Sequence, residues 1–172
     1  MKDPHLATVW TARLCAGLWL ASLAVAVRSG RAETARRRWR GLWTAGAVAL
    51  LIHVLAAFHF EHSWSHEAAY EHTREQTAAT VGVNWGGGLY FNYLAVVVWL
   101  ADAAFLWRVT PLSRRQNSGL AVDWFVAFMM VNATVVFGPW GWRPAGVAIV
   151  LWLLFLFRKR RTGSENASVE VS

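Results

Sequence analysis

Long apolar stretches that carry almost no charge constrain this chain of 172 residues more than any other feature. The hydrocarbon core of a bilayer is about 30 Å thick and needs about 20 helical residues to cross it. Four stretches meet that length, namely residues 6–27, 42–60, 87–107 and 119–137. A shorter run reaches a comparable length, residues 140–157, when two interfacial tryptophans at its start are included. The sequence therefore predicts an all-α, polytopic membrane bundle of about five spans.

Composition supports a membrane protein and argues against binding to nucleic acid. Hydrophobic residues make up 56% of the chain, charged residues 16%, and twelve residues are tryptophan. The net charge is +7, but the basic residues punctuate the apolar runs and do not line one face. A nucleic-acid-binding surface needs a continuous basic face, so we expect the lipid bilayer to be the main partner.

The distribution of lysine and arginine predicts the orientation. Segments 28–41, 108–118 and 158–172 hold 13 of the 17 basic residues, whereas the alternate connections hold three. Basic residues are enriched in cytoplasmic loops, which predicts an N-terminus outside, a C-terminus in the cytoplasm and residence in a plasma (inner) membrane. The tail at 158–172 is basic and then polar without apolar periodicity, so we expect disorder there.

Two features of the first apolar run affect its interpretation. Ala24, Val25 and Ala26 resemble a signal-peptide cleavage site, but cleavage there would leave six arginines on the outer side. We therefore expect a retained span. Cys15 is the single cysteine, so it cannot form an internal disulfide, and we expect a buried structural thiol.

The connection at 61–86 is the candidate functional region. Residues 59–77 hold four of the six histidines and four of the ten acidic residues. No proline or glycine occurs between Phe60 and Val81, so the second span is expected to continue as an extracytoplasmic helix. That helix is expected to bend at Ser63 or Ser65 and to stop at Gly82. The glycines at 86–88 are expected to supply a bend before the third span, with close approach of another backbone as the alternative.

Histidine spacing in this region predicts a site for Cu, Zn or Fe. On one helix His59, His62 and His66 fall within a sector of about 60°. Imidazoles three and four residues apart can reach one metal, but about 10 Å of rise separates the outer two, so a kink or a further ligand is required. His72 and the intramembrane His53 are weaker candidate ligands. There are two alternatives to a metal site. These histidines are interface residues solvated by headgroups and water, or they form a pH-sensitive element that protonates near pH 6.

Other chemistry is not favoured. The residues between His62 and His66 are Ser, Trp and Ser, so the His-Glu-x-x-His protease motif is absent. Glu67, Glu71 and Glu75 follow a separate helical stripe. Haem is not favoured, because bis-histidine ligation needs opposed helices and His5 alone lies away from the second span.

Polar residues inside the spans are candidates for helix contacts or for a polar path. Arg13, Asn92 and Asn132 fall in the outer half of the bundle, and we expect interhelical hydrogen bonds there. For His53 we expect a hydrogen-bonded side chain, with a ligand or proton relay as the alternative. Asp102 and Asp123 lie near the inner ends, where pairing with arginines is expected.

Three functions remain open from the sequence. The first is a metal-binding membrane protein for metal handling or support of a redox partner. The second is a non-catalytic membrane subunit or scaffold that docks an extracytoplasmic protein. The third is a small proton- or ion-coupled transporter that uses His53, Arg13 and Asp102. The sequence indicates no catalytic residue.

Overall fold

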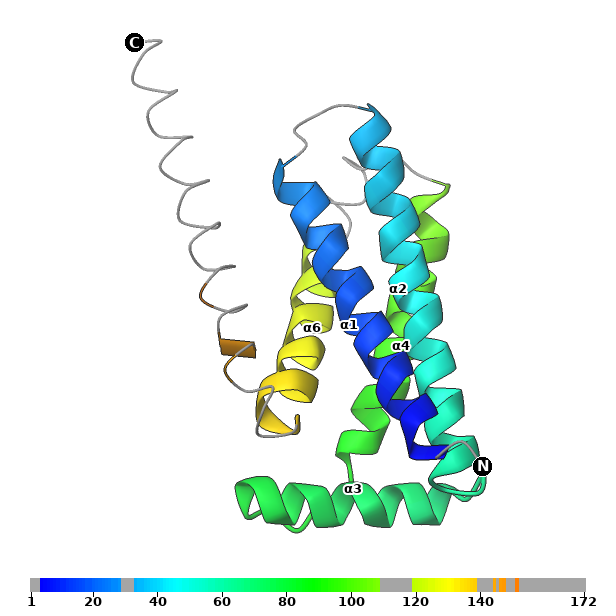
Figure 1. Ribbon diagram of the computed structural model, residues 1–172, viewed down its shortest axis with the longest axis vertical. Coiled ribbons are helices and arrows are strands. Elements are labelled where there is room, and N and C mark those ends of the chain that lie inside the picture. The colour runs from blue at the N-terminus through cyan, green and yellow to red at the C-terminus, as the bar shows by residue number, and fades with distance from the viewer. Residues whose placement is uncertain are drawn as a thin grey trace. The chain divides into compact units, whose positions relative to one another are not determined.

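The computed structural model describes residues 4–28, 33–108 and 119–138, together with Pro144, Gly146, Val147 and Leu151. Every regular element within these residues is helical, as the sequence predicts. The helices are α1 (Pro4–Arg28), α2 (Glu33–Phe60), α3 (His66–Val81), α4 (Gly88–Leu106), α6 (Gly119–Val131) and the π-helical turn η1 (Asn132–Val136) (Figure 1).

Four of these segments are long and apolar enough to cross a membrane, which fits an integral membrane protein. They are His5–Ala26, Glu33–Phe60, Gly88–Leu106 and Gly119–Val136. These four correspond to the four longer spans predicted from sequence. Of the predicted fifth span at 140–157 only four residues are described, and the tail at 158–172 lies outside the described residues.

The chain divides into two compact units, Met1–Met129 and Met130–Ser172. The second unit contains the end of α6 and η1. There the Thr134 hydroxyl donates to the Met130 carbonyl at 2.8 Å, and the Phe137 N–H donates to the Asn132 carbonyl at 3.0 Å. The longer i to i+5 backbone bond is that of a π-turn, which locally widens the helix.

In the first unit α2 packs against both α1 and α4. Apart from Trp43, the buried residues of α2 are small, among them Gly46 and Ala47, and small residues let neighbouring helices approach closely. Trp99 of α4 fills the space over Gly46 and is fully buried. On the α1 side the Cys15 thiol is buried and lies 3.6 Å from the Gly46 carbonyl, which confirms the expected structural thiol.

The helix α2 begins nine residues before the predicted span, because part of the arginine-rich connection is helical. Glu33 pairs with Arg36 and Arg37, three and four residues further on. Alanine, glutamate and arginine are also good helix formers. The apolar window at 42–60 is therefore only the apolar part of a longer helix.

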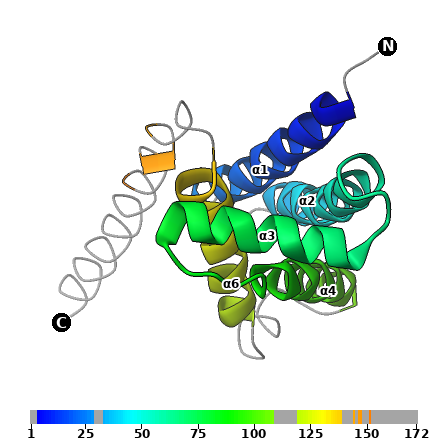
Figure 2. The same ribbon diagram turned by 90° about the horizontal axis from the view of Figure 1, so that it is seen from below.

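The predicted helical extension of the second span, bent at Ser63 or Ser65, is present as a separate helix. α2 ends at Phe60, and α3 begins at His66 as a separate helix. Figures 1 and 2 show α3 lying crosswise beneath the ends of α2 and α4. Ser65 caps α3 by accepting the Ala68 N–H at 3.1 Å, and Gly82 ends it with a left-handed φ of 76°, where the sequence predicts the stop.

Candidate metal site at the turn between α2 and α3

Residues 61–65 form a tight turn that redirects the chain. The Trp64 N–H donates to the Phe58 carbonyl at 2.9 Å, and the Ser65 N–H donates to the His62 carbonyl at 2.8 Å. Ser63 and Trp64 have φ values of 48° and 61°, in the left-handed region that non-glycine residues rarely adopt. The predicted bend is therefore a full turn, and it changes which histidines can meet.

The structure does not bring His59, His62 and His66 together. The Nδ1 atom of His59 accepts a hydrogen bond from the Trp64 indole at 3.2 Å. His66 lies on the other side of the turn, with its Nδ1 atom 3.0 Å from the Tyr93 hydroxyl of α4. Each of these two histidines therefore has an aromatic partner of its own.

His62 meets His72, the candidate that the sequence ranked lower. Their ring centroids lie 5.3 Å apart, with an angle of 56° between the planes. His62 comes from the turn and His72 from the second turn of α3. Ten residues separate them, so only the turn at 61–65 makes them neighbours.

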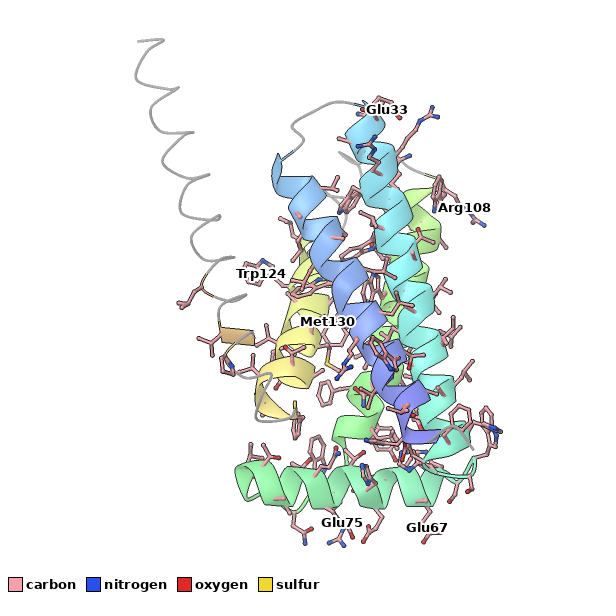
Figure 3. The ribbon with its side chains drawn as sticks, in the orientation of Figure 1. Glu33, Glu67, Glu75, Arg108, Trp124 and Met130 are labelled. Carbon is pink, nitrogen blue, oxygen red and sulfur yellow. The ribbon has the colours of Figure 1, made fainter. Side chains whose placement is uncertain are left out.

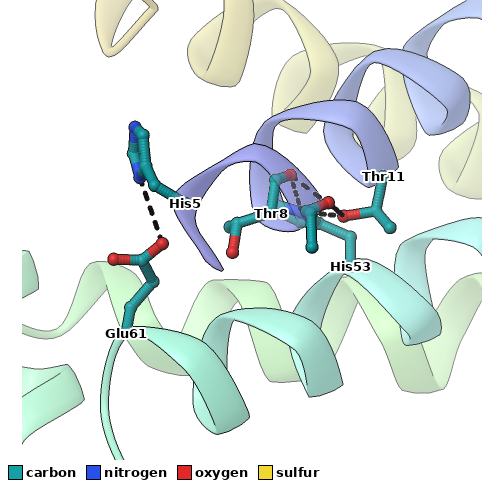
Figure 4. Close-up of polar contacts among 6 residues, drawn as sticks. His5, Thr8, Thr11, His53 and Glu61 are labelled. Carbon is teal, nitrogen blue, oxygen red and sulfur yellow. Dashed lines mark hydrogen bonds and ion pairs between the residues drawn. The ribbon is translucent and has the colours of Figure 1, made fainter. Parts of the chain in front are cut away.

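The carboxylate of Glu61 lies beside His62 and contacts a third histidine. The Oε1 atom of Glu61 lies 3.1 Å from Nδ1 of His5, at the start of α1 (Figure 4). Glu61 also interacts electrostatically with His62. We call these four residues the histidine cluster: His5, Glu61, His62 and His72. The side chains of this cluster come from α1, from the turn at 61–65 and from α3. The sequence did not predict that Glu61 belongs to it.

The surroundings of His62 favour the neutral form of its imidazole. Desolvation lowers the pKa of His62 from its ordinary value of 6.5, the positive charge of His72 lowers it further, and Glu61 partly opposes both. Partial desolvation raises the pKa of Glu61, but hydrogen bonds from His5 and Thr8 and the positive charges of His5 and His62 outweigh it, so the net shift is downward. Near pH 7 His62 is therefore a neutral potential ligand beside an ionised carboxylate.

His53 is separate from this cluster and hydrogen-bonds to α1. Its Nδ1 atom lies 3.2 Å from the Thr11 hydroxyl and 3.2 Å from the Thr8 carbonyl (Figure 4). This geometry agrees with the expectation of a hydrogen-bonded intramembrane histidine. These contacts join α2 to α1.

The remaining polar candidates have different surroundings. The Arg13 guanidinium lies 4.9 Å from the centre of the Trp10 ring, a cation–π contact within α1. Asn92 is exposed on α4. Asp102 is buried and accepts the Trp43 indole N–H at 2.8 Å. Asp123 is half-buried on α6, and two of the arginines expected near it, Arg114 and Arg115, lie outside the described residues.

Several contacts fix α3 against α4 and so position His72. A Cβ atom at Gly86 would lie 2.5 Å from the Tyr70 carbonyl oxygen, so Gly86 permits a close backbone approach besides the expected bend. The Arg74 guanidinium donates to the Asn84 side chain at 2.6 Å and pairs with Glu71. The rings of Tyr70, Tyr90 and Tyr93, all three tyrosines of the chain, pack in sequence beside His66.

No protein-family model, curated protein sequence or solved structure matches this chain. Within the described ranges no group of three or more His, Cys, Asp or Glu side chains surrounds a single point in a way that could hold a metal. The closest approach to such a site is the two-imidazole arrangement of His62 and His72. Function must therefore be inferred from this geometry.

Proposed function

We propose that this chain is an integral membrane protein that binds a divalent transition metal through His62 and His72. The observation that carries the proposal is the 5.3 Å between the two ring centroids. A tetrahedral Zn²⁺ ion about 2.1 Å from each ring nitrogen would hold two imidazole centroids about 5 Å apart. The observed spacing of the two rings is therefore compatible with an ion bound between them.

Electrostatics supports the same pair. Metal binding requires a neutral imidazole, and the lowered pKa of His62 keeps that ring neutral near pH 7. The Glu61 carboxylate adds negative charge beside His62, which favours a cation. Imidazole suits Cu, Zn and Fe, and among divalent ions Cu²⁺ is expected to bind most tightly.

Two protein ligands leave coordination positions open for water or for a group from another molecule. Open positions are typical of sites that pass on a metal or act on a bound group, whereas structural zinc sites are closed by four ligands. We propose that the site serves metal handling or supports a redox partner. The arginine bias of the connections supports an extracytoplasmic position for it.

Metal content after purification in detergent tests the proposal. Wild-type protein exposed to Cu²⁺ or Zn²⁺ and then desalted is expected to retain about one ion per chain, and His62→Ala/His72→Ala is expected to bind at least about tenfold more weakly. The matched control is His59→Ala/His66→Ala, which removes the same number of imidazoles and should retain the metal. Equal losses in both double variants would contradict a specific pair.

A second candidate, a docking surface for an extracytoplasmic protein, is supported by the outer face of α3. Glu67, Glu71 and Glu75 are exposed, and Figure 3 shows the labelled Glu67 and Glu75 pointing away from the other helices. We propose a basic partner surface for this face. A photo-crosslinker at Glu75 that captures one partner, with capture lost on raising the salt concentration, would support docking. Unchanged capture by the His62→Ala/His72→Ala variant would separate docking from metal binding.

A further inference from the structure

The opposite end of the α1–α2 pair carries a small cavity beside a cluster of arginines. The cavity has a volume of about 100 Å³ and is lined by Val25 and Ala26 of α1 and by Ala35, Arg36 and Trp39 of α2. Three aliphatic side chains and an indole make most of its wall apolar. Among the described residues of the lining, Arg36 is the charged one.

Positive charge dominates the surface around this cavity. Arg36, Arg37, Arg38 and Arg40 lie within five residues of α2, and Glu33 pairs with the first two. The side chains of Arg36 and Arg37 are 47% and 77% exposed. Exposed ion pairs of this kind contribute little to stability, so Arg36 can exchange its carboxylate partner for another anion.

An apolar hollow next to an exposed guanidinium matches the chemistry of one class of ligand. The headgroup of an anionic phospholipid offers a phosphate that arginine can bind with two parallel hydrogen bonds, and its first methylene groups need apolar contact. Trp39 is half-buried and stacks on Trp43 with ring centroids 6.0 Å apart, in the position of an interfacial tryptophan. Basic pockets between spans at the membrane surface bind such headgroups.

We propose that the cavity between Val25 and Trp39 is a binding site for one anionic phospholipid, with Arg36 contacting the phosphate. The occupant is a lipid of the leaflet that faces the arginine-rich connections. This inference is independent of the metal site, which lies at the other end of α2.

Lipid retention in native mass spectrometry tests the site. Protein is reconstituted into nanodiscs of phosphatidylcholine with phosphatidylglycerol, and the bound lipids are counted after release. Arg36→Gln is expected to reduce retained phosphatidylglycerol about tenfold, the effect of losing a charge-assisted contact. The matched control is Arg37→Gln, which removes the same charge. The Arg37 side chain also pairs with Glu33, but it does not line the cavity.

Two further arms separate a site from diffuse attraction. Ala26→Leu narrows the cavity without changing charge and should also reduce retention, whereas added inorganic phosphate should not displace the lipid. Equal losses for Arg36→Gln and Arg37→Gln, equal retention of phosphatidylcholine, or displacement by phosphate would each overturn the proposal. An unchanged elution volume of every variant confirms that the bundle is folded.

Discussion

The indole N–H of Trp43 donates to the Oδ2 atom of Asp102 at 2.8 Å, and this hydrogen bond joins α2 to α4 where both residues are buried. Trp43→Phe removes the donor, leaves the acceptor in place and should lower the free energy of unfolding by about 0.5–2 kcal/mol. Unfolding in mixed SDS micelles measures this loss.

Trp107 provides a control for that prediction, because its indole donates to the Thr44 hydroxyl at 3.1 Å and also bridges α4 to α2. Trp107 is 59% exposed, so water or lipid headgroups can replace the bond. Trp107→Phe should therefore cost less than Trp43→Phe. Equal losses of unfolding free energy in the two variants would show that burying the Trp43–Asp102 hydrogen bond adds nothing to stability.

Gly46 should not tolerate a side chain. A Cβ atom there would lie 2.8 Å from Cζ2 of Trp99, a fully buried ring with no space into which to move. Gly46→Ala should therefore destabilise the protein by about 1–3 kcal/mol. Gly41→Ala on the same helix meets no atom within 4 Å and should be neutral or slightly stabilising, because alanine favours helix. Thermal unfolding of the two variants side by side gives the comparison.

The cap of α3 should control how firmly His72 is held. Ser65→Ala removes the acceptor for the Ala68 N–H and should cost the helix about 1 kcal/mol. Hydrogen exchange should then rise in the first turns of α3 and stay unchanged in α4. Ser63→Ala is the control, since Ser63 caps no described helix. Faster exchange in both variants alike would assign the effect to the turn and not to the cap.

Stability should depend on pH through His62 in a defined direction. Its pKa in the folded protein lies below the ordinary value of 6.5, so the unfolded chain binds more protons in the window between the two values. Stability should therefore be constant above about pH 6.5 and fall as the pH drops through this window. His62→Gln should flatten this part of the profile of melting temperature against pH.

The Glu61 carboxylate gives a second, separate window. Its pKa is lowered from 4.5, so its contribution is present above that value and is lost as the pH falls through the folded-state pKa. Glu61→Gln should remove this acid loss. It should also widen the His62 window below pH 6.5, because Glu61 opposes the lowering of the His62 pKa. A single transition that both variants abolish would contradict two separate windows.

The helices could be predicted from sequence because apolar windows of membrane length have few alternatives. The early start of α2 was missed, since Glu33 and the following arginines look like a loop when only hydropathy is considered. The stop at Gly82 was predicted correctly, because a glycine with positive φ is a common helix end.

The candidate site was predicted only in part, and the turn at 61–65 explains why. Ser63 and Trp64 adopt left-handed φ values, although neither residue type signals such a conformation. A helical wheel assumes that the helix continues, so it grouped His59 with His62 and His66. Once the chain turns, His62 meets His72, and the pairing depends on packing that periodicity does not encode.

The most direct test of the proposed function is to count the imidazoles bound to Cu²⁺ by pulsed electron paramagnetic resonance. We predict two coordinated imidazoles in the wild-type protein, one after His72→Ala, and two after His59→Ala/His66→Ala. A spectrum without coordinated imidazole, or one that His59→Ala/His66→Ala alters while His72→Ala does not, would contradict the proposed pair.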